Sequence, residues 1–460
     1  LAAGLDFGTS GCRINVVDSE TRTVTHEGAV SWASGDSSSP AAWIDALETL
    51  IAQVPTELRQ RLTRICVSGT SASCLLLDAA TNAVTRGPRM YNCNVVSELP
   101  PEVGAAALDD LRRIAPPAHT TLSGTSALAK LVAWHLEAPL LQTERLAHQA
   151  DFVARHLRTV GTISCGDGGY GGNDGYSDCY GVVTTDWNNA LKAGYDVREL
   201  CWPAWLLESD LGRGGGIAAA LPQRVVRPGA FTGTVSAALA ARLGNGGSAC
   251  RTVAGTTDSV AAFIAAGVDC AGVAVTSLGS TLAIKLLSDS FVEDASRGVY
   301  SHRLGTEARP LWLVGGASNV GCATLRQEGF SPEELRSLSR EIDPAHRSAL
   351  GDLYYPLPGS GASGERFPTN DPRKAAVLEP RPASRAEYLQ AILQAIARVE
   401  AEGFAALRSL GATELREVLT AGGGAVNPTW TAMRAGMLGV PTAAAANADA
   451  AYGAALLALQ

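Results

Sequence analysis

A glycine-rich turn near the start of the chain carries residue types that bind phosphate. Leu5–Phe7 is a short apolar run, Cys12–Asp18 alternates as a strand does, and Gly8-Thr9-Ser10-Gly11 lies between them. Such a turn directs backbone N–H groups into a concavity, and its two hydroxyls add donors. Asp6, which precedes it, could hold Mg²⁺ directly or through water. An ordinary hairpin turn is the alternative, and these four residues alone favour it.

The same pattern recurs later in the chain. Leu278-Gly279-Ser280-Thr281, followed by the apolar run Leu282–Leu287, aligns with the first turn, and Ser277 occupies the position of Asp6. Two copies of one strand–turn–strand pattern suggest two domains of similar design. Two facing hairpins could hold the phosphate chain of one nucleotide, and only the first copy carries a carboxylate.

Asp258 is a candidate general base. It lies in Ala254-Gly255-Thr256-Thr257-Asp258-Ser259, directly before the predicted helix Ser259–Ala266. As a helix N-cap, Asp258 would accept backbone N–H bonds. As a base, it would take a proton from a substrate hydroxyl. N–H bonds to the carboxylate would lower its pKa, but in phosphoryl transfer the base mainly orients the hydroxyl, so a weak base suffices.

A third candidate segment contains a run of three glycines. The predicted strand Arg416–Thr420 leads into Gly422-Gly423-Gly424, and Asn427-Pro428 has the residues of a helix start. Glycines between a strand and a helix let the backbone approach a flat ligand closely. Trp430 could flank a purine ring. A helix cap for Asn427 and a core position for Trp430 are equally consistent alternatives.

Composition and pattern place these motifs in an α/β protein of two domains. Helices are predicted at Pro40–Gln53, Glu57–Leu62 and Ser126–Ala138, and a strand at Thr63–Ser68, so strands and helices alternate. The net charge is −8 and the sequence has no basic stretch, which argues against nucleic acid and anionic membranes as partners. A Gly-x4-Gly-Lys-Ser/Thr phosphate loop is absent from the sequence.

Ten cysteines are scattered along the chain without a Cys-x-x-Cys pair, which indicates a reducing compartment. Two of them, Cys165 and Cys179, lie in the glycine-rich insert Gly161–Gly181. A regulatory disulfide there is the less favoured interpretation, because so glycine-rich a loop does not specify cysteine geometry.

Together, four ordered motifs resemble the FGGY family of carbohydrate kinases. They are Leu5-Asp6-Phe7-Gly8-Thr9-Ser10-Gly11, Gly255-Thr256-Thr257-Asp258, Ser277-Leu278-Gly279-Ser280-Thr281 and Gly422-Gly423-Gly424-Ala425-x-Asn427. The resemblance runs from Leu5 to the predicted C-terminal helix Asp449–Leu459. It implies two ribonuclease-H-like domains of the actin/Hsp70-like ATPase fold, with mixed sheets flanked by helices and the active site in the interdomain cleft.

The resemblance also implies a role for each motif. Asp258 would be the catalytic base, and Asp6 would serve magnesium and the reacting hydroxyl. Ser10, Gly11 and Ser71 would line the sugar site. The ATP site would comprise Thr9, Gly279, Ser280, Thr281, Gly422, Gly423, Gly424, Asn427 and Trp430. Two further carboxylates, Asp151 and Asp186, match family positions near the cleft, but helix capping explains them equally well.

Within the family, the chain is most similar to the D-ribulose kinase branch of cyanobacteria and plants. Supporting stretches include Gly69-Thr70-Ser71 and Asn189-Ala190-Leu191-Lys192. Larger relatives hold their sugars with a Trp-x-Asp-x-Arg segment, whereas this chain has Met90-Tyr91-Asn92-Cys93-Asn94. The resemblance therefore implies ATP- and Mg²⁺-dependent phosphorylation of D-ribulose. The alternatives are a D-xylulose kinase and an actin-like or Hsp70-like ATP-binding switch.

The domains expected are residues 1–268, with the sugar site, magnesium and Asp258, and residues 269–460, with the ATP site. D-ribulose and ATP would be the ligands, and the chain would be a monomer or a homodimer. The resemblance to plant enzymes suggests the plastid stroma, with the cytoplasm as the alternative.

Overall fold

A computed structural model describes residues 1–158, 182–213, 216–244, 250–359 and 364–460 of the chain. The insert Gly161–Gly181, with Cys165 and Cys179, therefore lies outside the described residues. The chain divides into two compact units, Leu1–Ala265 with Asp449–Gln460, and Ala266–Ala448. Each unit is described here by itself.

The first unit is built on a mixed sheet of six strands in the order β10-β11-β4-β1-β2-β3. The hairpin strands β1, β2 and β3 pair antiparallel, whereas β4 lies parallel to β1 and β11 parallel to β4. The strands span Ala2–Phe7 (β1), Gly11–Val17 (β2), Val24–Ser31 (β3), Arg64–Gly69 (β4), Phe231–Thr234 (β10) and Arg251–Val253 (β11). Both strands predicted around the first glycine turn are confirmed.

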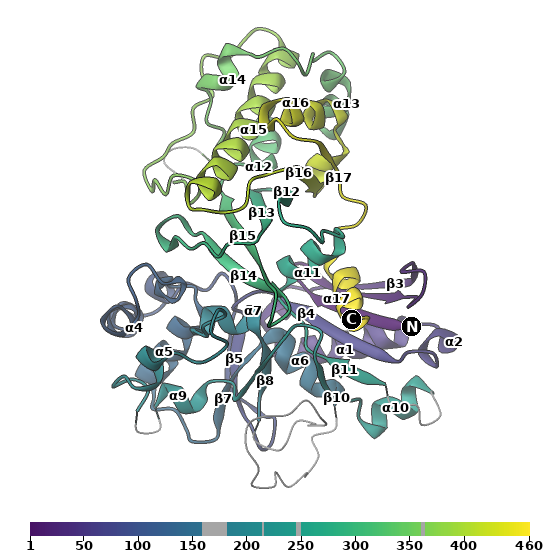
Figure 1. The fold of residues 1–460 in the computed structure, drawn as a ribbon, viewed down its shortest axis with the longest axis vertical. Coiled ribbons are helices and arrows are strands. Elements are labelled where there is room, and N and C mark those ends of the chain that lie inside the picture. Colours follow the sequence, from purple (N-terminus) through teal and green to yellow (C-terminus); the bar gives the residue numbers. More distant parts are fainter. Residues whose placement is uncertain (159–181, 214–215, 245–249, 360–363) are drawn as a thin grey trace. The chain divides into compact units, whose positions relative to one another are not determined.

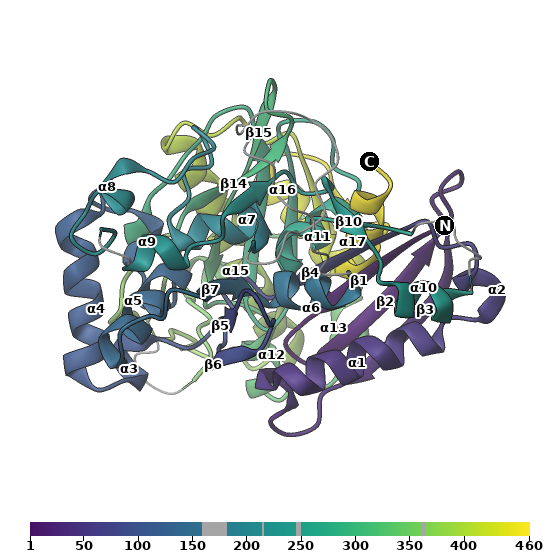
Figure 2. The same ribbon diagram turned by 90° about the horizontal axis from the view of Figure 1, so that it is seen from below.

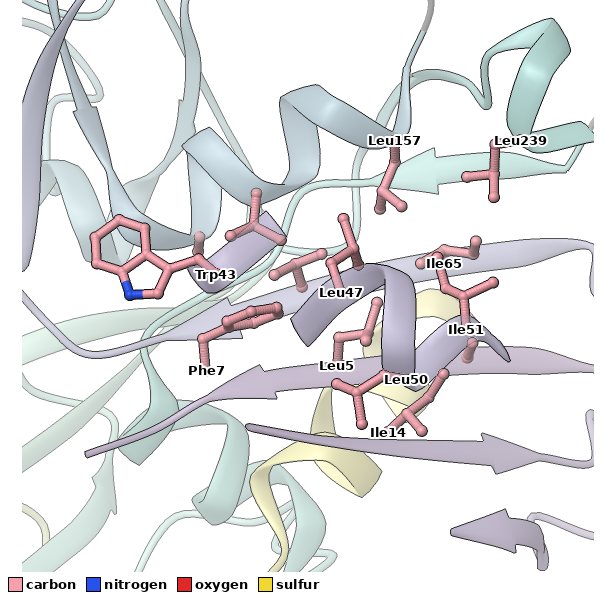
Figure 3. Close-up of a cluster of buried hydrophobic side chains, with 14 of the residues drawn as sticks. Leu5, Phe7, Ile14, Trp43, Leu47, Leu50, Ile51, Ile65, Leu157 and Leu239 are labelled. Carbon is pink, nitrogen blue, oxygen red and sulfur yellow. The ribbon is translucent and has the colours of Figure 1, made fainter. Parts of the chain in front are cut away.

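One face of this sheet is covered by α1, Pro40–Gln53, the helix predicted with the same bounds. Pro40 occupies its first turn and Ser39 caps it by accepting a hydrogen bond from the N–H of Ala42. Figure 2 shows α1 running along β2 and β3. Figure 3 shows the core between helix and sheet, where Trp43 and Leu47 of the helix lie near Phe7 and Leu5 of β1.

Smaller elements complete the first unit. Two further sheets comprise β6-β5-β7 and β8-β9. Their strands are Cys74–Asp78 (β5), Val84–Arg89 (β6), Glu144–His148 (β7), Thr184–Asp186 (β8) and Arg224–Val226 (β9). The remaining helices are Thr56–Arg59 (α2), Val95–Glu98 (α3), Pro101–Ile114 (α4), Ala127–Glu137 (α5), Gln149–Leu157 (α6), Trp187–Ala190 (α7), Ala204–Leu207 (α8), Ile217–Ala220 (α9), Ala237–Leu243 (α10) and Asp258–Ala265 (α11). The helix predicted at Glu57–Leu62 is thus shorter than expected.

The last helix of the chain, α17, Ala450–Ala458, belongs to the first unit. Its apolar residues Ala454, Leu457 and Ala458 share a buried cluster with Ala2 of β1 and Cys66 of β4. The boundary expected at 268/269 lies close to the observed one, but it assigned this helix to the C-terminal domain. The difference arises because sequence order does not reveal which sheet an apolar helix will cover.

The second unit repeats the sheet of the first. Its order is β14-β15-β13-β12-β16-β17, in which β12, β13 and β15 pair antiparallel while β16 and β17 continue parallel to β12. The strands span Val273–Leu278 (β12), Leu282–Ser288 (β13), Tyr300–Gly305 (β14), Pro310–Ser318 (β15), Glu417–Ala421 (β16) and Thr442–Ala444 (β17). The order β15-β13-β12-β16-β17 therefore matches β3-β2-β1-β4-β11, and the two glycine turns occupy the same place in each sheet.

The helices of the second unit are Cys322–Gln327 (α12), Pro332–Ser339 (α13), Ala349–Leu353 (α14), Arg385–Ser409 (α15) and Pro428–Leu438 (α16). The longest, α15, packs on β13 and β15, and α13, α14 and α16 pack on α15 (Figure 1). Short 3-10 helices occur at 36–38, 120–122, 191–193, 295–297 and 423–426. Across the described residues of both units, none of the helices has the length and apolarity that a membrane span needs.

Candidate functional site

Asp6 occupies the carboxyl end of β1 and is partly buried. Ser68 of β4 donates a hydrogen bond from Oγ to Oδ1 of Asp6 at 2.8 Å. Burial, followed by the negative charge of Asp258, raises the pKa of Asp6 to about 7, against the opposing effect of the Ser68 bond. Burial and a second carboxylate nearby both disfavour the ionised form of Asp6, and a bound cation would offset both effects. A hydrated Mg²⁺, which takes one or two carboxylates plus water and phosphate oxygens, fits this donor set.

Asp258 reaches the neighbourhood of Asp6 through the loop before α11. Thr257 forms a parallel bridge with Gly69 at the end of β4. The preceding Gly255 lies so close to β4 that a Cβ there would be 1.7 Å from the carbonyl oxygen of Val67. Asp258 itself is the first residue of α11, and its Oδ1 accepts a bond from the N–H of Ser259 at 2.6 Å. The structure thus brings together the two acidic residues predicted from the sequence.

The first glycine turn is closed by a bond from the N–H of Gly8 to the carbonyl of Gly11 at 2.9 Å. Trp32 stabilises it from the side, because its indole Nε1 donates to the carbonyl of Gly8 at 2.9 Å. Thr9 and Ser10 are exposed at its tip. The predicted hairpin is therefore present, with its two hydroxyls available to a ligand.

Ser71 lies in the loop after β4, next to the first turn. The register of β1 and β4 pairs Phe7 with Gly69, so both strands end at the same edge of the sheet. Behind the loop, Gln149 Oε1 accepts bonds from the N–H and the hydroxyl of Thr70 at 3.1 and 2.9 Å. The amide Nε2 of Gln149 takes no part in these bonds and has no hydrogen-bond partner among the described residues.

The segment Met90–Asn94 lies beside the Ser71 loop. Lys130, fully buried, donates from Nζ to the carbonyls of Met90 at 2.7 Å and Ala72 at 2.8 Å. In addition, the N–H of Tyr91 bonds to Ser73 Oγ at 2.9 Å. Lys130 therefore holds the two loops together, a role that its sequence position on a helix did not reveal.

Asp186 and Asp151 occupy capping positions, as the sequence allowed. Asp186 caps α7 by accepting from the N–H groups of Asn188 and Asn189, and it also accepts from Asn189 Nδ2 at 2.6 Å. Asp151 forms a capping box with His148 at the start of α6. Burial, followed by the charge of Asp151, raises the pKa of Asp186 to about 7.

A buried polar network extends from α7 to the loop of Asp258. Asn188 Nδ2 donates to Thr256 Oγ1 at 3.1 Å, and both side chains are fully buried. Sequence analysis missed Asn188, since an asparagine in a short helix carries no signal for a partner 68 residues away.

Six buried side-chain atoms around this edge have no hydrogen-bond partner among the described residues. These atoms, which we call the polar cluster, are Ser71 Oγ, His148 Nε2, Gln149 Nε2, Asn188 Oδ1, Asn189 Oδ1 and Thr257 Oγ1. Buried polar atoms without a protein partner usually bond to ordered water or to a ligand. The polar cluster therefore marks a place prepared for hydrogen-bonding groups from outside the chain.

In the second unit, Ser277 of β12 pairs with Ala421 of β16, so the second glycine turn and the glycine run lie at the same edge of the sheet. The turn is closed by a bond from the N–H of Gly279 to the carbonyl of Thr281 at 3.2 Å. Ser280 and Thr281 are exposed. Gly424 packs against Leu278, which directly precedes the turn, and a Cβ at Gly424 would lie 2.6 Å from Leu278 Cβ.

Asn427 is the helix cap that the sequence suggested. Its Oδ1 accepts from the N–H of Trp430 at 3.1 Å, while its Nδ2 donates to Ser339 Oγ at 2.8 Å. The ring of Trp430 is only 2% exposed and its Nε1 donates to the carbonyl of Leu393 at 3.0 Å. A ring buried to this degree offers no face to a purine, contrary to the expectation that Trp430 borders the adenosine. Trp430 instead packs against Gly424, where an added Cβ would lie 2.7 Å from its ring.

Two further groups near the turns were missed from the sequence. Arg13 stands opposite Asp6 in the β1–β2 register and pairs with Asp449, Nη1 to Oδ2 at 3.3 Å. Its positive charge opposes the rise in the pKa of Asp6. Arg326 of α12 donates from Nη2 to Ser280 Oγ at 2.7 Å. Within the described ranges, no group of three or more His, Cys, Asp or Glu side chains could hold a metal ion.

Comparison with known proteins gives a consistent family relationship. The C-terminal domain model of the FGGY family of carbohydrate kinases matches residues 274–460. A xylulose kinase of Arthrobacter sp. (strain NRRL B3728) is 32% identical over 94 residues, which are 20% of this chain and 95% of that protein.

Solved structures match over nearly the whole chain. A "xyloylose kinase" from Brucella ovis has a TM-score of 0.76 at 23% identity and covers 99% of this chain and 89% of its own. The xylulose kinase from Bifidobacterium adolescentis has a TM-score of 0.76 at 20% identity, covering 100% and 92%. Plasmodium falciparum glycerol kinase with ADP has a TM-score of 0.76 at 15% identity, covering 99% and 88%. At these identities, the likeness shows the fold.

Proposed function

Because this chain belongs to the FGGY family of carbohydrate kinases and is an ATP-dependent sugar kinase, we propose that it phosphorylates the terminal hydroxyl of a pentulose, D-ribulose. Asp258 is the general base in this proposal, and the sugar lies at the edge of the first unit where β1 and β4 end. The actin-like or Hsp70-like switch, the remaining alternative from the sequence, is unsupported because the matching family is one of carbohydrate kinases.

The polar cluster carries this proposal. It combines amide, hydroxyl and imidazole groups, which donate to and accept from sugar hydroxyls. It contains no carboxylate or guanidinium atom, so it suits a neutral polyhydroxy ligand. Thr257, one of its members, directly precedes Asp258 in the chain, and this adjacency supports Asp258 as the base.

Asp6 is the proposed magnesium ligand and Thr9 the hydroxyl that meets phosphate, while Ser10, Gly11 and Ser71 line the proposed sugar site. When bound, Mg²⁺ would neutralise negative charge on the phosphates. In this proposal Asp258 orients the sugar hydroxyl and takes its proton, and the protein dipoles around the site replace water. In the second unit, Gly279–Thr281 and Gly422–Gly424 are the proposed ATP-binding segments, with Asn427 fixing the second of them as a helix cap.

D-xylulose is the second candidate substrate, because the named relatives include xylulose kinases. D-ribulose is preferred because the chain resembles the D-ribulose kinase branch of the family. Met90–Asn94, in place of the charged sugar-binding segment of larger relatives, favours a small open-chain ketose, a description that fits both sugars. The proposal further includes a monomer or homodimer. The resemblance to plant enzymes favours the plastid stroma as its location, with the cytoplasm as the alternative.

A panel of D-ribulose, D-xylulose and the pentitols, measured by coupled ADP release, tests the substrate. The highest kcat/KM with D-ribulose supports the proposal, and a preference for D-xylulose replaces it with the alternative. ADP release that no sugar stimulates would contradict both.

Gln149→Ala tests the sugar site itself. Loss of one hydrogen-bond donor to the sugar should raise KM for D-ribulose about tenfold and leave KM for ATP unchanged. Gln142→Ala, at an exposed position of the same unit, is the matched control. Equal KM values for the two variants would remove Gln149 from the sugar site.

A further inference from the structure

Arg326 is a positively charged side chain bonded directly to the second glycine turn. Its Nη2 donates to Ser280 Oγ at 2.7 Å, and the side chain is exposed. A guanidinium has five N–H donors. Among the described residues, Ser280 accepts one of the hydrogen bonds that the Arg326 guanidinium can donate. The remaining N–H donors are available to a ligand at the turn.

The start of α12 is fixed to the same turn. The N–H groups of Cys322 and Ala323 donate to the carbonyls of Gly279 and Ser280 at 2.9 and 3.1 Å. Gly321 permits this approach, since a Cβ there would lie 2.5 Å from the carbonyl oxygen of Ser280. Arg326 follows Cys322 by four residues and therefore emerges on the same face of the helix. The guanidinium is held beside the turn by the backbone as well as by its own bond.

The charge at this turn differs from that at the first turn. Asp6 precedes the first turn, whereas Ser277 occupies the equivalent position in the second. A polyphosphate repels a carboxylate but forms short, charge-assisted hydrogen bonds with an arginine. The second turn, with hydroxyls, backbone N–H groups and a guanidinium together, is thus the more favourable of the two for direct phosphate contact.

We propose that Arg326 binds the phosphate chain of ATP at the Gly279–Thr281 turn. This inference rests on the proposed placement of ATP at that turn. It assigns the phosphate-binding cation of the second unit to α12, outside every segment that the sequence motifs mark. The guanidinium would bridge Ser280 and a phosphate oxygen, so that its contribution grows with the number of phosphates on the nucleotide.

Equilibrium binding of adenosine, AMP, ADP and ATP to the whole protein tests this without relying on turnover. In the wild type, affinity should rise from AMP to ATP. In Arg326→Gln that rise should shrink about tenfold or more, while adenosine binding is unchanged. Arg326→Lys should retain part of the rise, because a lysine keeps the charge without the fork of donors.

Arg309→Gln is the matched control. Arg309 is also exposed and lies beyond the opposite end of β15, and the β13–β15 pairing places the second turn near the Ser318 end. Nine strand residues therefore separate the two sites, roughly 25 to 30 Å at the rise of a strand. This variant should bind all four nucleotides as the wild type does. Raised salt should weaken ATP binding to the control more steeply than to Arg326→Gln.

The outcomes separate the two proposals. If Arg326→Gln binds ATP as the control does, or loses adenosine and ATP in equal measure, the role of Arg326 is overturned while ATP binding stands. If the wild type binds adenosine and ATP equally well, the phosphate site at this turn is overturned together with Arg326.

Discussion

Asn188 donates a hydrogen bond to the hydroxyl of Thr256 at 3.1 Å, which ties α7 to the loop that presents Asp258. Both residues are fully buried, so the bond is shielded from bulk solvent. Asp186 fixes Asn188 in turn by accepting its backbone N–H at 2.8 Å. The position of the proposed base thus depends on residues from a separate part of the first unit.

Asn188→Ala should lower kcat for sugar phosphorylation about tenfold and leave KM for ATP unchanged, because a displaced base loses alignment with the hydroxyl. Thr256→Val should have a similar effect. In a double-mutant cycle, the combined variant should cost little more than either single one. Simple additivity of the two losses would mean that this bond does not position the loop.

Asp258→Ala should reduce sugar phosphorylation by about 10²-fold or more, since it removes the proposed proton acceptor. ATP binding, measured by calorimetry, should stay close to the wild-type value because the proposed ATP segments lie in the other unit. Asp269→Ala, at an exposed position, serves as the control. Retained turnover with D-ribulose would contradict the assignment of the base.

In the second unit, Arg434 and Glu400 form a fully buried ion pair. The guanidinium donates from Nε and Nη2 to the two carboxylate oxygens at 2.6 and 2.7 Å, and Nη1 reaches Thr420 of β16 at 2.7 Å. Thr276 of β12 adds a bond to Glu400 at 2.6 Å. This network joins α15 and α16 to the strands that lead into both glycine segments.

Glu400→Leu should destabilise the second unit by about 3–5 kcal/mol, because it leaves a guanidinium buried without its partner. Urea denaturation, followed through the buried Trp430, measures this. The control is Glu414→Leu, which breaks the exposed pair with Arg408 and should cost about 1 kcal/mol or less. A double variant, Glu400→Leu with Arg434→Met, should recover most of the loss. Equal costs for the buried and exposed pairs would contradict the prediction.

The raised pKa of Asp186 makes the stability of the first unit depend on pH. Between about pH 4, its value in the unfolded chain, and about 7, its value in the fold, the folded state binds the extra proton. Stability should therefore fall as pH rises through this window. Asp151 contributes because its charge opposes ionisation of Asp186, and the raised pKa of Asp6 acts in the same direction.

Melting temperatures from pH 5 to 8 test this dependence. Asp186→Asn should flatten the fall, because it removes one of the two titrating carboxyls, while a residual slope from Asp6 should remain. Asp196→Asn, at a partly exposed position of the same unit, is the control. An unchanged slope in Asp186→Asn would mean that Asp186 does not hold a proton in the folded state near neutral pH.

The local chemistry of the chain was accessible from its sequence. Alternation and turn residues marked β1 and β2 around Gly8–Gly11, and the helix predicted at Pro40–Gln53 is α1. The echo at Gly279–Thr281 predicted two domains of one design, and both sheets share a strand order. These features depend on hydrogen bonds and apolar periodicity among neighbours in the chain, so neighbours suffice to predict them.

What only the tertiary structure decided depends on contacts between distant segments. Trp430 lies under Gly424 because α15 provides a partner for its indole, and α17 covers the first sheet although it follows the whole second unit. The bonds from Asn188 to Thr256 and from Arg326 to Ser280 likewise join residues that no local pattern relates. Sequence determined which residues could form turns, caps and acidic sites. Folding decided which of them meet, because burial and hydrogen-bond geometry act through space and not along the chain.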